Sequence, residues 1–258
     1  MWDAFIGVMI NILLFIYNSI GHNFGIAIIL FTLLIRLVTH PLTVQQLKGA
    51  QSMQDLQKDK RWLDMQAKYK GDKEKLSQEQ MKLYKEMGVN PFASCLPTLI
   101  QFPIIIGLYQ AVIQALATTP IELLNLTRHI YPGLLQVSSI IPLNNRFLWM
   151  DLGKPDLINV SWLPFGIPIL AVIVVITTYI QSKLITPPPA NPKDQGAAIS
   201  GMMNLYMPFL MGYLALTLAS GLSLYFVASN VIGIGQYAML GKVNWKSLIP
   251  SFGVKKAR

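Results

Sequence analysis

An arginine inside an apolar stretch is the residue of this sequence best suited to chemistry. Arg36 stands twelve residues after Phe24, in a segment that carries no other charge up to Val38. In a helix that rises about 1.5 Å per residue, Arg36 would lie about 18 Å from the start of the segment. Placing an arginine there costs on the order of 2.5–3.5 kcal/mol on membrane-insertion scales. A hydrated cavity would lower this cost, and in it Arg36 would attract carboxylates.

Two polar side chains are candidates to share this setting. Thr32 precedes Arg36 by one helical turn on the same face, and Gln101 offers polarity from another apolar segment. The apolar segments contain no Asp or Glu that could form an ion pair with Arg36. The alternative interpretation is a locally hydrated arginine whose head group snorkels to the membrane surface and has no function.

Metal, nucleotide and nucleophile chemistry have no matching motif. The one cysteine, Cys95, excludes an intramolecular disulfide and a cysteine-based zinc site, and the three histidines lie far apart in the sequence. There is no Walker loop and no dinucleotide-binding glycine motif. We therefore expect no cofactor, no metal, no catalytic residue and no enzymatic activity.

The elements that must hold these residues are predicted to be membrane-spanning helices. The chain is 53% hydrophobic and only 13% charged, with a mean hydropathy of +0.45, whereas about 25% charge is typical of soluble domains. Several apolar runs approach the roughly 20 residues that cross a bilayer as a helix. The expected fold is an all-α integral membrane protein with a five-helix transmembrane core.

The predicted segments follow one another along the whole chain. They are 1–22, an interfacial amphipathic helix; 23–41, the first transmembrane helix; 42–91, a cytoplasmic helical hairpin; 92–117, the second transmembrane helix; 118–161, an outer loop; 162–185, the third transmembrane helix; 186–202, a cytoplasmic loop; 203–240, the fourth and fifth transmembrane helices, divided at Ala219-Ser220-Gly221; and 241–258, a basic cytoplasmic tail.

The distribution of Lys and Arg predicts the orientation. Seventeen of them fall in or beside the segments 42–91, 186–202 and 241–258, and three fall in the loop 118–161. By the positive-inside rule, the first group and the C-terminus are cytoplasmic, in a multi-pass protein of the inner (plasma) membrane. The same rule accounts for the net charge of +9, so we expect no DNA partner.

The N-terminal segment is predicted to lie in the headgroup layer. Its apolar residues recur at helical spacing, while Asp3, Gly7, Asn11 and Asn18 form a thin polar stripe. An additional transmembrane helix is the alternative.

The charged segment 42–91 is predicted to form two helices. One follows Pro41 and runs to about Tyr69; the other begins at a capping box, Ser77 to Gln80, and stops at Gly88. The segment is either a mobile connector or an arm that docks on another protein or on the ribosome.

Four groups of motifs, in order, resemble the YidC/Oxa/Alb family of membrane protein insertases, in its short form without a large outer domain. They are Asn23–Gly25 with Thr32–Arg36 and His40–Leu42; Asn90–Pro97 with Leu99–Ile104; Phe147–Leu152; and Gly221–Asn230. Together they cover nearly the whole chain.

The resemblance implies a hydrophilic groove, open to the cytoplasm and to lipid, that receives polar tails of client proteins. Arg36, Thr32 and Gln101 correspond to groove positions of the family, and Phe226 to an aromatic position where some relatives carry Tyr; Tyr225 is adjacent. The implied partners are nascent membrane proteins, lipids, the ribosome and the Sec translocon. The alternative functions are a passive assembly scaffold and a small-solute transporter.

Overall fold

The protein is described by a computed structural model that covers residues 2–69, 71–89, 96–116, 119–131, 143–157, 166–185, 195–241 and 243. Within these residues it is mostly helical, as expected. The elements are α1 (Trp2–Ser19), α2 (Phe24–Val38), α3 (His40–Lys58), α4 (Lys60–Lys68), α5 (Lys73–Glu86), α6 (Leu96–Ala115), α7 (Pro120–His129), β1 (Arg146–Phe147), β2 (Met150–Asp151), α9 (Ile169–Ile185), α10 (Gln195–Thr217) and α11 (Ser220–Met239).

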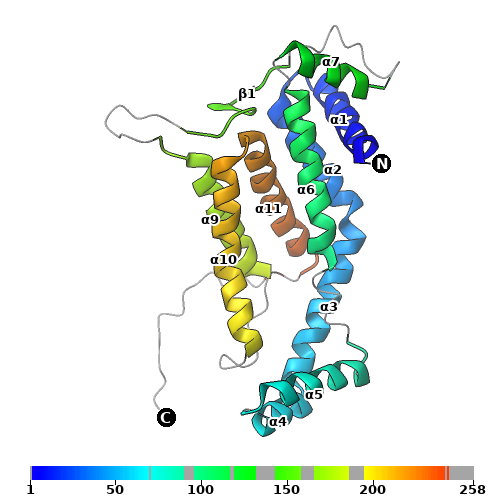
Figure 1. The fold of residues 1–258 in the computed structure, drawn as a ribbon, viewed down its shortest axis with the longest axis vertical. Coiled ribbons are helices and arrows are strands. Elements are labelled where there is room, and N and C mark those ends of the chain that lie inside the picture. The colour runs from blue at the N-terminus through cyan, green and yellow to red at the C-terminus, as the bar shows by residue number, and fades with distance from the viewer. Residues whose placement is uncertain are drawn as a thin grey trace. The chain divides into compact units, whose positions relative to one another are not determined.

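The chain divides into two compact units. The first comprises Met1–Leu37, Ile104–Thr186 and Met202–Arg258, and the second comprises Val38–Pro103 and Pro187–Gly201. In the first unit α9 and α11 run side by side, and α1 contacts α7 (Figure 1). Its core consists of large apolar side chains, among them Ile10, Leu13, Leu14, Phe24, Ile28, Phe31, Leu108 and Leu152.

Part of the predicted polar stripe on α1 is buried. Asp3 is exposed, but Asn11 is fully enclosed, and its amide donates to the carbonyls of Gly7 and His129, both at 2.7 Å. Its oxygen accepts the Tyr131 N–H at 2.9 Å. Gly7 and Asn11 are buried because this face of α1 lies against the end of α7, where Asn11 satisfies backbone groups. Whether α1 is interfacial stays a prediction.

The predicted division of the last apolar block is confirmed. Helix α10 ends at Thr217 and α11 begins at Ser220, with Ala219 as its N-cap. Helix α10 begins at Gln195, eight residues before the predicted start of the transmembrane segment at 203. No proline interrupts residues 195–202, so the helix continues through them.

Few of the described helices are long and apolar enough to cross a membrane by themselves. Among the described residues, α1 alone is long and apolar enough to cross a membrane by itself, and α2 with α3 qualify only as a bent pair. The apolar helices Phe102–Ala115, Ile169–Ile185 and Leu205–Thr217 are shorter. The count of five spans therefore stays a prediction.

The charged segment breaks where one helix was expected. Asp59 ends α3 and caps α4, and its carboxylate accepts the Arg61 N–H at 2.8 Å. The prediction of one helix to Tyr69 is wrong because an aspartate competes with the helix for backbone donors. Two apolar residues flank this break, Leu56 and Trp62, and they form a small core with Leu83 of α5.

The second helix of this segment starts earlier than its predicted capping box. Asp72 caps α5 by accepting the Lys75 N–H at 3.1 Å, so Ser77 lies inside the helix and the Ser77–Gln80 prediction is wrong. A capping box forms instead at α7, between Thr119 and Glu122. The predicted stop is confirmed, since Gly88 has a φ of +64° just after α5.

The loop 118–161 contains structure that the sequence patterns did not predict. Helix α7 is followed by an antiparallel β-hairpin, β1 and β2, in which Phe147 pairs with Met150 and Arg146 with Asp151. Residues 132–142 and 158–165 lie outside the described residues, as do Cys95, most of the loop 186–202 and nearly all of the tail 241–258.

Candidate functional site

Arg36, near the end of α2, is held by a serine of α11. Its Nη2 donates to Ser229 Oγ at 2.6 Å and to the Ser229 carbonyl at 2.9 Å, and its Nε donates to Ser229 Oγ at 3.2 Å. All of these atoms belong to the first unit. The planar guanidinium has donors arranged as a fork, which suits two acceptors on one residue.

The backbone of Arg36 is held by the same helix. Gln236 Nε2 donates to the Arg36 carbonyl at 2.9 Å. Helix α2 ends two residues later, at Val38, where the last carbonyls have no partner inside the helix. Helix α11 therefore fixes both the side chain and the backbone of Arg36.

A glycine makes room for this arrangement. A Cβ at Gly233 would lie 3.3 Å from Arg36 Nη2 and 2.6 Å from Gln181 Nε2. Any side chain at this position would therefore press on the guanidinium and on the amide of Gln181, which comes from α9.

Further polar contacts join α11 to α9. Asn230 Nδ2 donates to Thr177 Oγ1 at 3.0 Å and to Thr178 Oγ1 at 2.9 Å. We call the following residues the Arg36 cluster: Arg36, Thr177, Thr178, Gln181, Ser229, Asn230, Gly233 and Gln236. Sequence reasoning missed all of them except Arg36. The available signal was the spacing of Ser229, Gly233 and Gln236, at i, i+4 and i+7 on one face of α11.

The Arg36 cluster carries a positive charge and an unused acceptor. Helices α2, α9 and α11 contain no Asp or Glu, and Ser229, which accepts from Arg36, is neutral. Gln236 Oε1 is buried and accepts no hydrogen bond within the described part of the chain. The arrangement can therefore bind carboxylates and peptide N–H groups. Among the described residues no group of three His, Cys, Asp or Glu side chains could hold a metal.

Three further residues expected at the site are buried. Thr32 is 0% exposed, and its hydroxyl donates to the Ile28 carbonyl of its own helix at 2.7 Å. Tyr225 and Phe226 are 2% and 6% exposed and belong to the hydrophobic core, with ring centroids 5.8 Å apart. All three side chains are buried in this structure, and their role in a groove stays a prediction.

Gln101 completes the set of expected site residues. It lies in α6, in the second unit, and its side chain is outside the described residues. Its predicted role therefore stays a prediction.

The β-hairpin holds the opposite end of α11. The Ser220 N–H donates to the Lys154 carbonyl at 2.8 Å, the Ser220 hydroxyl to the Asp151 carbonyl at 2.6 Å, and the Gly221 N–H to the Leu152 carbonyl at 3.0 Å. Because the N-cap residue is an alanine, which has no side-chain acceptor, the hairpin backbone supplies the acceptors that a helix start requires.

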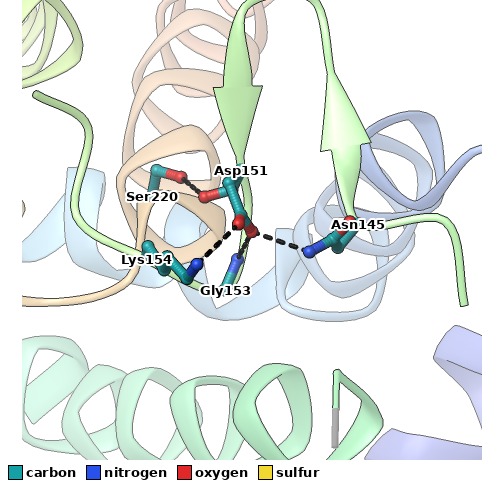
Figure 2. Close-up of polar contacts among 5 residues, drawn as sticks. All are labelled: Asn145, Asp151, Gly153, Lys154 and Ser220. Carbon is teal, nitrogen blue, oxygen red and sulfur yellow. Dashed lines mark hydrogen bonds and ion pairs between the residues drawn. The ribbon is translucent and has the colours of Figure 1, made fainter. Parts of the chain in front are cut away.

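An aspartate organises the base of this hairpin. The Asp151 carboxylate accepts from Asn145 Nδ2 at 2.9 Å and from the Gly153 N–H at 3.1 Å, and it pairs with Lys154 Nζ at 3.6 Å, as Figure 2 shows. The start of α11 therefore rests on a hairpin whose own conformation is fixed.

Comparison with known proteins gives these features a family. The model of the 60Kd inner membrane protein family matches residues 15–246. The chain is 32% identical over 242 residues to membrane protein insertase YidC 2 of Bacillus anthracis, which covers 92% of this chain and 80% of that protein. It is 33% identical over 238 residues to membrane protein insertase MisCA of Bacillus subtilis (strain 168), over 91% of this chain and 77% of that protein.

A solved structure agrees with this relationship. The crystal structure of an active YidC insertase with its first transmembrane domain resolved matches with a TM-score of 0.56 and 28% identity. The match covers 88% of this chain and 45% of that chain, so this chain spans under half of its length.

The names of these relatives also bear on the kind of activity. Five of the similar proteins are named as membrane protein insertases, and insertion moves a protein without covalent chemistry, so the chain is not an enzyme. With a family model over most of its length and relatives above 30% identity over most of theirs, this chain is a membrane protein that belongs to the 60Kd inner membrane protein family, the family of the YidC insertases.

Proposed function

We propose that this chain inserts client membrane proteins through a hydrophilic groove, open to the cytoplasm and to lipid, in which Arg36 receives the polar tail of the client. The client's transmembrane segment then leaves sideways into the bilayer. Lipids and nascent membrane proteins are the partners that the family implies. The proposal also includes the ribosome and the Sec translocon, which the charged segment 42–91 would meet in the cytoplasm, where we also place the C-terminus.

The observation that carries the proposal is the positive charge of Arg36 in a polar cluster whose three helices contain no Asp or Glu. Arg36 is bound through neutral oxygens of Ser229, and the three helices of the cluster contain no carboxylate. The Ser229 oxygens fix the position of the guanidinium, and the positive charge held there would attract a client carboxylate. In a low-dielectric setting such an attraction is much stronger than in water.

Client entry would have to open the packed structure. Thr32, Tyr225 and Phe226 are buried, so they meet a client only when α2 and α11 move apart. The Arg36–Ser229 and Gln236–Arg36 hydrogen bonds are the contacts that such a movement breaks. Gln236 Oε1, which accepts no bond within the described residues, then offers an acceptor to the N–H groups of the client.

The energy for insertion comes from the client. Burial of apolar surface contributes about 25 cal/mol per Å². The free energy gained when a typical transmembrane segment enters lipid is therefore larger than the cost of moving a short polar tail across the membrane. The membrane potential adds about 2.3 kcal/mol per charge and 100 mV. No nucleotide is needed.

Reconstitution tests the proposal. The purified chain in liposomes should insert a single-span client whose short outer tail contains Asp and Glu. Arg36→Ala should lose most of this insertion and Arg36→Lys should keep much of it, while both should insert a client whose tail carries Asn and Gln instead. Arg61→Ala, in the charged segment, is the matched control for loss of an arginine.

Three results would contradict the proposal. If Arg36→Ala inserts the acidic client normally, charge attraction is not the role of Arg36. If the unmodified chain alone inserts no client, it is a passive scaffold. If it conducts small solutes without inserting clients, it is a transporter. Crosslinks from Thr32, Gln101 and Phe226 to a client in transit would locate the path.

A further inference from the structure

The turn of the β-hairpin has an unfavourable backbone conformation at an exposed leucine. Leu148 and Trp149 connect β1 to β2, and Leu148 has a φ of +54°. Two-residue hairpin turns normally place Gly, Asn or Asp at such positions. Leucine has no polar group to stabilise this conformation, and its side chain is 75% exposed. Neither turn geometry nor packing inside the protein accounts for a leucine here.

The turn stands on a fixed base. The Asp151 carboxylate ties the two strands together (Figure 2). The ring of Phe147 occupies the space where a Cβ of Gly25 would stand, so β1 packs directly against the start of α2. The turn residues are therefore held at a defined place instead of moving with a flexible loop.

This place is the end of three apolar helices. Gly25 is the second residue of α2, Ser220 is the first residue of α11, and Leu170, whose N–H donates to Asp156 Oδ2 at 2.9 Å, is the second residue of α9. All three helices, α2, α9 and α11, therefore begin beside the hairpin. If these helices cross the membrane, as in the proposed arrangement, their common end lies at the membrane–water interface.

The side chains around the turn match the chemistry of that interface. Trp149 is 50% exposed beside Leu148, and tryptophan is enriched at the level of the lipid head groups. Arg146 and Lys154 are exposed on the same hairpin, where they suit lipid phosphates. A turn exposed only to water would not favour Leu148 and Trp149.

We infer that Leu148 and Trp149 insert into the headgroup–acyl boundary of the outer leaflet and bind lipid there, with Arg146 and Lys154 at the phosphates. The inference rests on the membrane arrangement of the proposed function, but not on client binding. It makes the β-hairpin a lipid anchor that sets the depth of the starts of α2, α9 and α11 in the bilayer.

Spin labels of a cysteine-free variant (Cys95→Ser) test this contact. Labels are placed at Leu148→Cys, at Ile176→Cys in the middle of α9, and at Met81→Cys in α5, all exposed apolar positions. In liposomes of phosphatidylcholine and phosphatidylglycerol, collisions with oxygen report lipid and collisions with a water-soluble nickel chelate report water. The labels at 148 and 176 should collide with oxygen, and the label at 81 with the chelate.

The outcomes separate this inference from the membrane arrangement. A label at 148 that behaves like the one at 81, or that neither reagent reaches because another protein copy covers it, overturns the lipid contact. A water-accessible label at 176 instead overturns the membrane arrangement itself.

A glycine variant separates lipid contact from internal packing. Leu148→Gly should unfold at the same temperature or higher in detergent, because glycine adopts positive φ readily. In liposomes with brominated acyl chains it should weaken the quenching of Trp149, measured as the difference from Trp149→Phe. A lower unfolding temperature for Leu148→Gly, or unchanged quenching, contradicts the inference.

Discussion

The two ends of α11 are held in different ways. At its start, the N–H groups of Ser220 and Gly221 and the Ser220 hydroxyl all donate to carbonyls of residues 151–154. Phe147 fills the space beside Gly25. Toward its end, Ser229 holds a charged side chain, Gly233 lets Arg36 and Gln181 approach the helix closely, and Gln236 has one buried acceptor without a hydrogen bond within the described residues. This difference between the two ends of one helix, the closed end at its start and the polar end, is consistent with the proposed groove, which would admit polar groups from one side only.

The largest effect is expected where the closed end is tightest. In Gly25→Ala the new methyl group displaces the Phe147 ring, and overpacking of this kind costs about 3 kcal/mol at the upper end of its usual range. The unfolding temperature in detergent should fall clearly. Gly235→Ala, whose Cβ meets nothing within 4 Å, is the matched control. Equal unfolding temperatures would show that the hairpin does not pack on α2.

A smaller effect on stability is expected at the polar end. Ser229→Ala removes the hydroxyl that accepts two bonds from Arg36, and bonds to a charged group contribute about 1.5–3 kcal/mol. The variant should be less stable in detergent and, because Arg36 is released, should still insert acidic clients. Loss of that insertion at an unchanged unfolding temperature would mean that Ser229 contacts the client.

Ser220→Ala should have a milder effect at the closed end. It removes the hydroxyl bond to Asp151 but leaves both backbone bonds of the helix start, and a neutral hydrogen bond contributes about 1 kcal/mol. A modest fall in unfolding temperature with normal client insertion is expected. An insertion defect without a stability change would give the closed end a direct role in transport.

The smallest effect on stability should come from Gly233→Ala. The methyl group meets the ends of two flexible side chains, Gln181 and Arg36, and replacing glycine by alanine in a helix contributes about 1 kcal/mol of stability. The unfolding temperature should therefore change little, while insertion of acidic clients should fall because Arg36 is displaced. Normal insertion would show that insertion does not depend on the position of Arg36 against Gly233.

Local sequence signals predicted the local features of this chain. The helix break before Ser220 and the stop at Gly88 follow from residue types that act on their nearest neighbours. Two predictions were wrong where two local signals competed. Asp72 caps α5 instead of Ser77, and Asp59 interrupts a helix that the spacing of apolar residues favoured.

Features made by distant residues were out of reach. Asn11 joins α1 to residues 118 and 120 positions away, and Ser229 is 193 positions from Arg36. A single sequence shows that Arg36 is exceptional, but not which helix packs against it. Thr32 was expected near Arg36 from its spacing, and Tyr225 and Phe226 were expected at the groove by resemblance; the burial of all three depends on packing that one sequence does not show.

The separation of Arg36 and Ser229 along the sequence means that the two residues are synthesised at different times. At a synthesis rate of about 5–20 residues per second, 193 residues take roughly 10–40 s to make. Throughout that interval α2 exists with its arginine while α11 does not. The newly made chain is therefore itself a membrane protein whose early helix carries an unlatched charge, the same difficulty that the finished protein is proposed to solve for its clients.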